Sequence, residues 1–278
     1  IDTENFGWNK TYYWKVRPIY NDESYGEWSE ISNFEVGNTI LTNVSIEVED
    51  YNQVADGILV YSQFLPYFAV GAIDKWGNEV WNTQTAYMNH INEYGQIYGV
   101  TDNKGTKFNF NHDFLWVSPE DYSIDSHEVK QIPNGNYMGF QRITQLGPIA
   151  PGDWSFLFQG YEIDGVTNEY PWLGLKIVEF DQDTGQEVWS WNPFDHFSMQ
   201  DYDLYEGTWW NAAFDGFYDW MHSNAFHFDE EESVIYVSHR HLSRISKIAY
   251  PSGDVIWNMG LPEEYNTGSD NICTDLLF

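Results

Sequence analysis

The stretch that decides the fold is 177–189, IVEFDQDTGQEVW, which reads as a short apolar strand, a turn with glycine and a strand closing on tryptophan. The same pattern occurs at 70–81, VGAIDKWGNEVW, and at 245–257, ISKIAYPSGDVIW. Glycine tolerates the positive φ of such a turn, and the Asp or Ser before it can bond its own backbone. A hairpin repeated at long, irregular intervals is typical of a β-propeller with elaborated loops, in which the tryptophan fills the gap between neighbouring sheets.

The composition favours an all-β protein of acidic character. Aromatic residues make up 19% of the 278 positions, and such side chains suit half-buried pleated surfaces. Twelve Lys and Arg face 43 Asp and Glu, for a net charge of −31. This balance excludes a nucleic-acid partner, because phosphate binding needs a basic surface. It also repels small anions unless a basic site reverses the field locally.

The chain ends and the single cysteine bear on where the protein works. Cys273 stands alone, so no disulfide forms within the chain. No apolar run reaches the length of about 18 residues that a membrane-spanning helix needs. The chain begins without Met or a signal-peptide pattern. We expect a fragment of a longer polypeptide.

Residues 1 to about 36 follow a different pattern from the rest of the chain. We expect three short strands at 11–17, 27–30 and 33–36, because their polar and apolar side chains alternate. The stretch 11–36, TYYWKVRPIYNDESYGEWSEISNFEV, resembles the last strands of a fibronectin type III module. The resemblance implies a β-sandwich fragment with its linker at 1–38, followed by a second domain at 39–278.

A second repeated unit combines a histidine, a strand, a turn and a strand. It occurs at 126–140, SHEVKQIPNGNYMGF, and again at 221–238, and His127 and His222 each stand just before the first strand. In a propeller the innermost strands of all blades line one channel, so equivalent positions converge on its axis. We therefore expect His127 and His222 to face each other near the channel mouth.

The sequence Ser238-His239-Arg240-His241 follows this second unit at once. If the strand continues, Ser238 and Arg240 share one face and His239 and His241 share the other. An arginine beside a histidine in an acidic protein suits the binding of an oxyanion, and the histidine can carry a proton near neutral pH. The alternative is that His222 is a core histidine and that Arg240 pairs with a carboxylate.

A metal centre is the rival interpretation of the same histidines. His222, His227, His239 and His241 are close in sequence to Asp219, but their spacing fits no zinc motif and no thiol accompanies them. We expect no metal and no other cofactor, while a calcium site in an aspartate-rich loop is left open. The sequence also lacks a phosphate-binding glycine loop and a Gly-x-Ser-x-Gly elbow.

Residues from about 45 to 278 resemble bacterial arylsulfotransferases that work without a nucleotide sulfate donor. The stretch 219–260 carries the resemblance through the pattern D-W-x-H-x-N followed by a strand ending S-x-R. SHEVKQIPNGNYM and KIVEFDQDTGQEVWSWNPFDHF support it. The resemblance implies a six-bladed propeller, of which about four blades are present here.

What the resemblance implies chemically is a ping-pong transfer of a sulfuryl group from a small aromatic sulfate donor to a phenol acceptor through a sulfohistidine. His222, Arg240 and His127 match the catalytic positions, and Asn224 and Ser238 are expected to contact substrate. The nucleophilic histidine has no counterpart in the 278 residues and is expected beyond Phe278. The resemblance also implies a secreted protein, in the periplasm or at the cell surface. The full-length protein is then an aryl-sulfate sulfotransferase.

Two further interpretations remain open on the sequence. A non-catalytic extracellular propeller that binds glycans, phenolics or a protein partner suits the aromatic residues and the fibronectin-like segment. A quinoprotein dehydrogenase shares the hairpin pattern but needs a tryptophan platform and calcium. The sequence leaves the oligomeric state open, homo-oligomers included.

Overall fold

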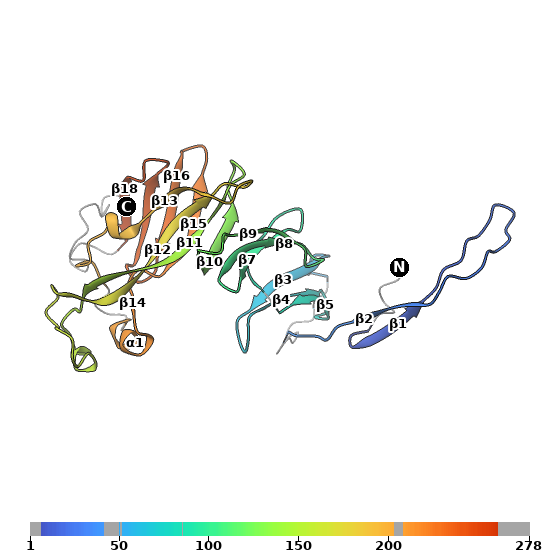
Figure 1. Cartoon of the computed structure of the whole chain (residues 1–278), viewed down its shortest axis with the longest axis horizontal. Coiled ribbons are helices and arrows are strands. Elements are labelled where there is room, and N and C mark those ends of the chain that lie inside the picture. The colour runs from blue at the N-terminus through green and yellow to red at the C-terminus, as the bar shows by residue number, and fades with distance from the viewer. Residues whose placement is uncertain (1–6, 42–49, 51, 85, 203–207, 261–278) are drawn as a thin grey trace. The chain divides into compact units, whose positions relative to one another are not determined.

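The computed structural model describes residues 7–41, 50, 52–84, 86–202 and 208–260. The chain divides into two compact units, Ile1–Thr85 and Ala86–Phe278 (Figure 1). Antiparallel sheets make up most of both units, so the predicted all-β class is confirmed. The domain boundary predicted at 38 and 39 falls inside the first unit and stays a prediction. No helix among the described residues is long and apolar enough to cross a membrane.

The first unit contains a two-stranded and a three-stranded sheet. Strand β1 (Lys10–Trp14) pairs with β2 (Ser32–Val36), and β3 (Ile58–Gln63), β4 (Ala69–Asp74) and β5 (Glu79–Thr83) follow. The hairpin predicted at 70–81 is confirmed as β4 and β5.

The third strand predicted in the N-terminal segment, at 27–30, is wrong. Around it, Gly26 N–H donates to the Pro18 carbonyl and Ser29 N–H to the Val16 carbonyl, and no ladder forms. Proline cannot donate a return hydrogen bond, which interrupts the pairing. Trp28 instead packs beneath two cations, with Lys15 Nζ 4.4 Å and Arg17 Cζ 4.6 Å from its ring centroid. The fibronectin resemblance and the sandwich fragment stay predictions.

Among the described residues, the second unit contains three consecutive sheets, which are antiparallel apart from one short parallel pair. The first holds β6 (Tyr87–Ile91), β7 (Ile97–Thr101), β8 (Lys104–Phe108) and β9 (Phe114–Val117). The second holds β10 (Ile124–Gln131), β11 (Tyr137–Pro148), β12 (Asn168–Phe180) and β13 (Glu187–Trp191), with β14 (Tyr218–Asp219) parallel to β12. The third holds β15 (Ser223–Asp229), β16 (Val234–His239), β17 (Arg244–Ala249) and β18 (Val255–Gly260). Helix α1 (Thr208–Asp215) precedes β14, and short 3-10 turns lie at Ser155–Leu157 and Pro193–Asp195. The fold is β-rich and propeller-like, while the number of blades stays a prediction.

The first strands of the three sheets lie together, as expected for inner strands of a propeller. Strand β10 contacts both β6 and β15. Each first strand also carries a β-bulge, near Asn89 in β6, between Ile124 and Val129 in β10, and near Asn224 in β15. Bulges redirect side chains and are frequent beside functional sites. This line of first strands is where the candidate site is found.

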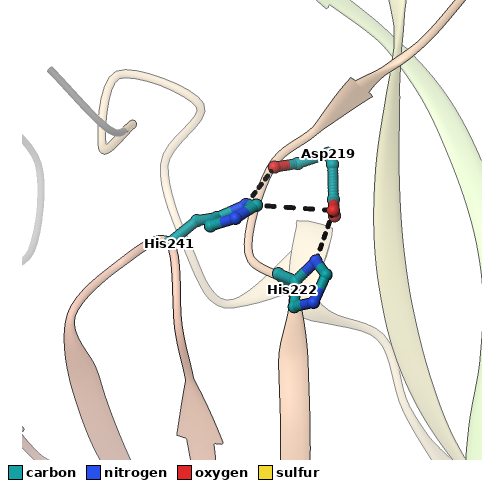
Figure 2. Close-up of side chains that lie close together, drawn as sticks. All are labelled: Asp219, His222 and His241. Carbon is teal, nitrogen blue, oxygen red and sulfur yellow. Dashed lines mark hydrogen bonds and ion pairs between the residues drawn. The ribbon is translucent and has the colours of Figure 1, made fainter. Parts of the chain in front are cut away.

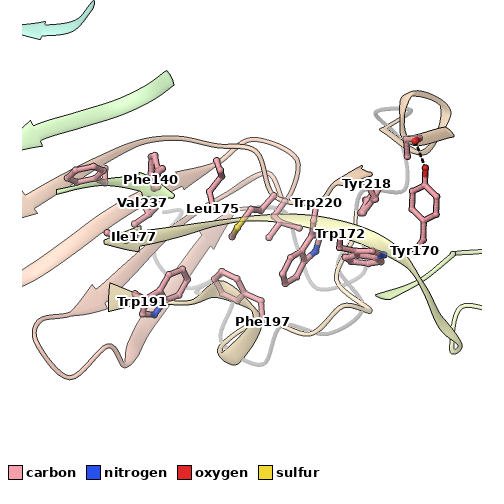
Figure 3. Close-up of a cluster of buried hydrophobic side chains, with 14 of the residues drawn as sticks. Phe140, Tyr170, Trp172, Leu175, Ile177, Trp191, Phe197, Tyr218, Trp220 and Val237 are labelled. Carbon is pink, nitrogen blue, oxygen red and sulfur yellow. Dashed lines mark hydrogen bonds between the residues drawn. The ribbon is translucent and has the colours of Figure 1, made fainter. Parts of the chain in front are cut away.

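Tryptophans join the second and third sheets (Figure 3). The indole N–H of Trp189 donates to the Pro251 carbonyl at 2.8 Å, and that of the buried Trp191 donates to the Gly253 carbonyl at 3.0 Å. Gly253 has φ 82°, which permits the turn between β17 and β18. The hairpins predicted at 177–189 and 245–257 are confirmed, and Trp189, the closing tryptophan of the first, connects the two sheets. Trp257, the closing tryptophan of the second, contacts Tyr236 of its own sheet.

A buried carboxylate on β12 links the turn between β10 and β11 to the third sheet. Glu179 accepts hydrogen bonds from the side-chain amides of Asn134 and Asn136 and from the Tyr250 hydroxyl at 2.8 Å. Desolvation and the Glu179 hydrogen bond raise the pKa of Tyr250 to about 12. A charged group so deep in the fold is stable only because its lone pairs are satisfied.

Candidate functional site

His127 and His222 approach each other, as the repeated unit predicts. Their ring centroids are 4.9 Å apart, with the planes at 73°. His222 stands just before β15, in the predicted position, with φ 45°. That left-handed conformation is uncommon for residues other than glycine and is often found at functional sites. The position predicted for His127, just before its strand, is wrong, because β10 begins at Ile124 and runs through His127 within the bulged part of the strand.

His241 is a third member of this cluster. Its ring centroid lies 4.6 Å from that of His222. The backbone explains the approach: His241 N–H donates to the Met221 carbonyl, and Arg240 N–H donates to the His222 carbonyl, both at 3.1 Å. The segment entering β15 and the turn after β16 are therefore hydrogen-bonded side by side, which holds His222 and His241 in fixed relation.

Asp219 at the end of β14 contacts both of these histidines (Figure 2). Its carboxylate oxygen Oδ2 forms a short hydrogen bond with His222 Nδ1 and lies 3.9 Å from His241 Nδ1. The backbone carbonyl of Asp219 accepts a hydrogen bond from His241 Nδ1 at 2.7 Å. A carbonyl only accepts, so the proton of His241 is on Nδ1. Burial lowers the pKa of His241, which favours this neutral form.

Asp125 plays the corresponding part for His127. Its Oδ1 lies 2.5 Å from His127 Nδ1 and also accepts the His127 backbone N–H at 3.0 Å. This hydrogen bond raises the pKa of His127. Although burial of Asp125 acts in the opposite direction, the bonds from His127 hold the pKa of the carboxyl below its usual value. On the other side, the Asn89 side-chain amide donates to the Ser126 carbonyl at 2.6 Å and so supports the backbone at the histidine.

Arg240, Ser238 and Asn224 line one cavity of about 420 Å³, whose lining includes the buried His239 but not His127, His222 or His241. Strand alternation was predicted to put Ser238 and Arg240 on one face. That reason is wrong, because β16 ends at His239 and Arg240 lies in the turn that follows. Ser243 closes that turn with φ 49°. Among the residues that the structure describes, no carboxylate lies within 4.0 Å of the Arg240 guanidinium, contrary to the alternative of a paired arginine.

His239 lies in a different environment from His241, so the prediction that they share a face is wrong. His239 is buried and its Nδ1 lies 2.8 Å from the Ser223 hydroxyl. Burial, with the nearby Arg244 charge, lowers the pKa of His239 to about 3. The imidazole is therefore neutral at physiological pH. Of the five residues in the rival metal cluster, His227 is exposed on β15, and Asp219, His222 and His241 remain together.

In each of the three clustered histidines, the Nδ1 atom forms a hydrogen bond. Among described residues, none hydrogen-bonds the Nε2 atom of His127, His222 or His241. Each Nε2 is thus available to an incoming ligand, as a lone pair or as an N–H donor according to protonation. Together with Arg240, this arrangement suits an anion that exchanges protons.

Sequence reasoning assigned no role to Asp125. His241 was predicted as a proton carrier beside Arg240 or a metal ligand, and Asp219 as a metal ligand and part of the D-W-x-H pattern, but their contact was not predicted. Two signals were present in the sequence: an aspartate two residues before His127, and the aspartate of the D-W-x-H pattern three residues before His222. A carboxylate near a histidine is a common orienting partner. The contact of His241 with Asp219 has no local signal, because it depends on how two turns pack.

Comparison with known proteins gives one family match. Residues 161–275 match the family model described as arylsulfotransferase (ASST). The match supports the family resemblance of this part of the chain and, at the level of the family, aryl sulfotransfer. It includes the segment from Asp219 to His241 and begins after Asp125 and His127. None of the curated proteins matches the chain.

Two solved structures are similar to the chain at low sequence identity. One is a protein of unknown function from Bacteroides caccae, with 13% identity over 74% of this chain and 58% of that chain, at a TM-score of 0.40. The other is BamB from Moraxella catarrhalis, with 11% identity over 87% of this chain and 58% of that chain, at a TM-score of 0.35. The chain therefore spans less than two thirds of the length of either.

Proposed function

We propose that this protein transfers a sulfuryl group from a phenolic sulfate ester to a phenolic acceptor, with His222, Arg240 and His127 holding the group during transfer. The observation that carries the proposal is the convergence of three histidines, each with Nε2 uncommitted, beside an arginine that has no carboxylate partner among the described residues. The family match of residues 161–275 supports the same reaction class.

The reaction proceeds in two balanced displacements. An imidazole nitrogen lone pair attacks sulfur, the bond from sulfur to the aryl oxygen breaks, and the phenolate leaves and takes up a proton. The acceptor phenol then gives its proton to a base and its oxygen attacks the same sulfur, breaking the sulfur–nitrogen bond. Dividing the transfer in this way eases both steps. We assign the attack to a histidine beyond Phe278, as the family resemblance implies, so His222, Arg240 and His127 bind and stabilise the sulfuryl group.

Arg240 and His127 have complementary parts in this scheme. The guanidinium neutralises charge on the sulfuryl oxygens, as in phosphoryl transfer. His127 has a raised pKa, so a larger fraction is protonated near neutral pH and can donate from Nε2 to an oxygen or to the leaving phenolate. Asn224 and Ser238 contribute polar groups from the same cavity as Arg240.

Asp219 and Asp125 act as positioning residues. Each bonds Nδ1 of its histidine and so directs Nε2 toward the substrate. Asp219→Asn keeps the shape but removes the charge, which is worth about 1.5–3 kcal/mol in such a hydrogen bond. We expect kcat/KM to fall by about 10- to 100-fold. Asp229→Asn, an exposed change further along β15, is the matched control and leaves kcat/KM unchanged.

The direct test is transfer without nucleotide. The polypeptide in its full natural length is incubated with 4-nitrophenyl sulfate and phenol, and both 4-nitrophenol release and phenyl sulfate formation are measured. We expect release that depends on phenol and matches the phenyl sulfate formed. We also propose a secreted setting, periplasmic or at the cell surface, because small phenols are accessible there. A folded protein that binds phenols but transfers nothing contradicts the proposal and favours the non-catalytic propeller.

A further inference from the structure

The contacts of Asp219 define a second kind of site within the histidine cluster. Its carboxylate oxygen Oδ2 lies near the Nδ1 atoms of both His222 and His241, which come from two separate turns (Figure 2). We propose that Asp219, His222 and His241 bind one divalent transition-metal ion, with Zn²⁺ as the representative case. This proposal is independent of sulfuryl transfer.

The donor geometry supports a metal ion. One ligand atom from each of the three residues lies within 4.8 Å of the other two. Atoms that share a tetrahedral zinc ion at about 2.0–2.2 Å stand roughly 3.3–3.6 Å apart, so small side-chain rotations bring all three into range. Two imidazoles and a carboxylate form a donor set that suits zinc and related metals, whereas Mg²⁺ and Ca²⁺ prefer oxygen alone.

The backbone prepares this donor set in advance. Hydrogen bonds from His241 N–H to Met221 and from Arg240 N–H to His222 join the two ligand-bearing turns. Asp219 is fixed separately, because β14 pairs with β12 through Leu173. All three side chains are partly buried, so they are restricted but reachable from solvent. Little conformational freedom is therefore lost when a metal binds.

The net charge of the whole chain also favours a cation. The chain has a net charge of −31, which raises the local concentration of divalent ions. Three protein ligands leave an open fourth position, as in zinc sites that hold water or an exchangeable group. His222 belongs to both this site and the proposed sulfuryl site, so a bound metal ion excludes the sulfate ester and inhibits transfer.

The test measures metal binding and not activity. The chain, in a Cys273→Ser background that removes the only thiol, is stripped with chelator and titrated with ZnCl₂ by calorimetry, and with CoCl₂ by visible absorption. We expect one saturable Zn²⁺ site and Co²⁺ absorption bands of a four- or five-coordinate ion. His241→Ala and Asp219→Ala each weaken binding by at least about 100-fold. His227→Ala, which removes an exposed histidine of the same sheet, leaves the affinity unchanged.

Other outcomes overturn the proposal. These are no saturable site, binding unchanged in His241→Ala and Asp219→Ala, or binding lost in His227→Ala. His222→Gln, which keeps the side-chain volume, repeats the test where an alanine variant fails to fold, as judged by near-ultraviolet circular dichroism. If the protein transfers sulfuryl groups but binds no Zn²⁺, only the metal site is overturned. If it binds Zn²⁺ but the metal-free protein transfers no sulfuryl group, only the proposed function is overturned.

Discussion

Two pairs of histidine and arginine, one within the third sheet and one in the segments at its edge, differ in burial and in their partners. His239 and Arg244 are buried, and Arg244 pairs with the buried Asp201 at 2.5 Å. His222 and Arg240 lie beside solvent, with Nε2 of the histidine and the guanidinium of the arginine available. Only three residues separate the two arginines in the sequence.

The difference teaches that burial and carboxylate placement decide which polar residues support the fold and which act on a ligand. Burial acts to raise the pKa of Asp201 and to lower that of Arg244, so this pair is stable only while both partners remain. Arg240 has no such dependence. We therefore expect the two arginines to respond oppositely in measurements of stability and of activity.

The largest expected effect breaks the buried pair. Asp201→Ala leaves Arg244 without its carboxylate in the interior, which costs about 3–5 kcal/mol in the free energy of unfolding. Arg240→Leu changes the same quantity by no more than about 0.5 kcal/mol, as is usual for exposed positions. Urea denaturation of both variants measures the difference. Equal losses in the two variants contradict the distinction between the pairs.

The next effect concerns activity at the exposed arginine. Arg240→Leu removes the charge that neutralises the sulfuryl oxygens, so kcat falls by about 10²–10³-fold, which corresponds to about 2.7–4 kcal/mol. Lys247→Met on β17 removes a partly buried cation paired with Glu232 and serves as the control. Initial rates with 4-nitrophenyl sulfate test this. A similar loss of kcat in both variants would mean that the overall charge of the protein, and not Arg240 itself, causes the effect.

A smaller effect tests a second buried polar contact, between the second and third sheets. Tyr250→Phe removes a hydrogen bond to the buried Glu179 carboxylate, with an expected cost of about 1.5–3 kcal/mol. Tyr236→Phe removes an exposed hydroxyl that bonds Glu232 at 3.3 Å and costs no more than about 0.5 kcal/mol. Midpoints of urea unfolding report both. A larger loss of unfolding free energy in Tyr236→Phe than in Tyr250→Phe contradicts the importance of burial.

The last comparison concerns the pH dependence of two histidines. His127 has a folded pKa above 6.5, so its contribution to stability is fully present below pH 6.5 and is lost as pH rises through the folded value. His239 has a folded pKa of about 3, so it opposes folding increasingly as pH falls from 6.5 toward 3. Histidine ring resonances in NMR spectra give both titrations. His239 protonating at pH 6, or His127 remaining neutral there, contradicts the assigned environments.

The sequence predicted the hairpins and the meeting of His127 with His222 because both depend on repetition. Glycine at a tight turn and tryptophan at a strand end are local signals, and equivalent positions in repeated units converge. The end of β16 at His239 was not predictable from alternation, since the turn at Arg240 is fixed by hydrogen bonds to Met221 and His222. The contact of Asp219 with His241 likewise depends on packing between distant turns.

The measurement that tests the central claim most directly is detection of the covalent intermediate. The protein in its full natural length is incubated with excess 4-nitrophenyl sulfate, without nucleotide, and its intact mass is measured under mild conditions. The account predicts one added sulfuryl group on a histidine, discharged by phenol and formed slowly or not at all in His222→Ala and Arg240→Ala. Folded protein that shows neither the adduct nor phenol release with several donors contradicts it.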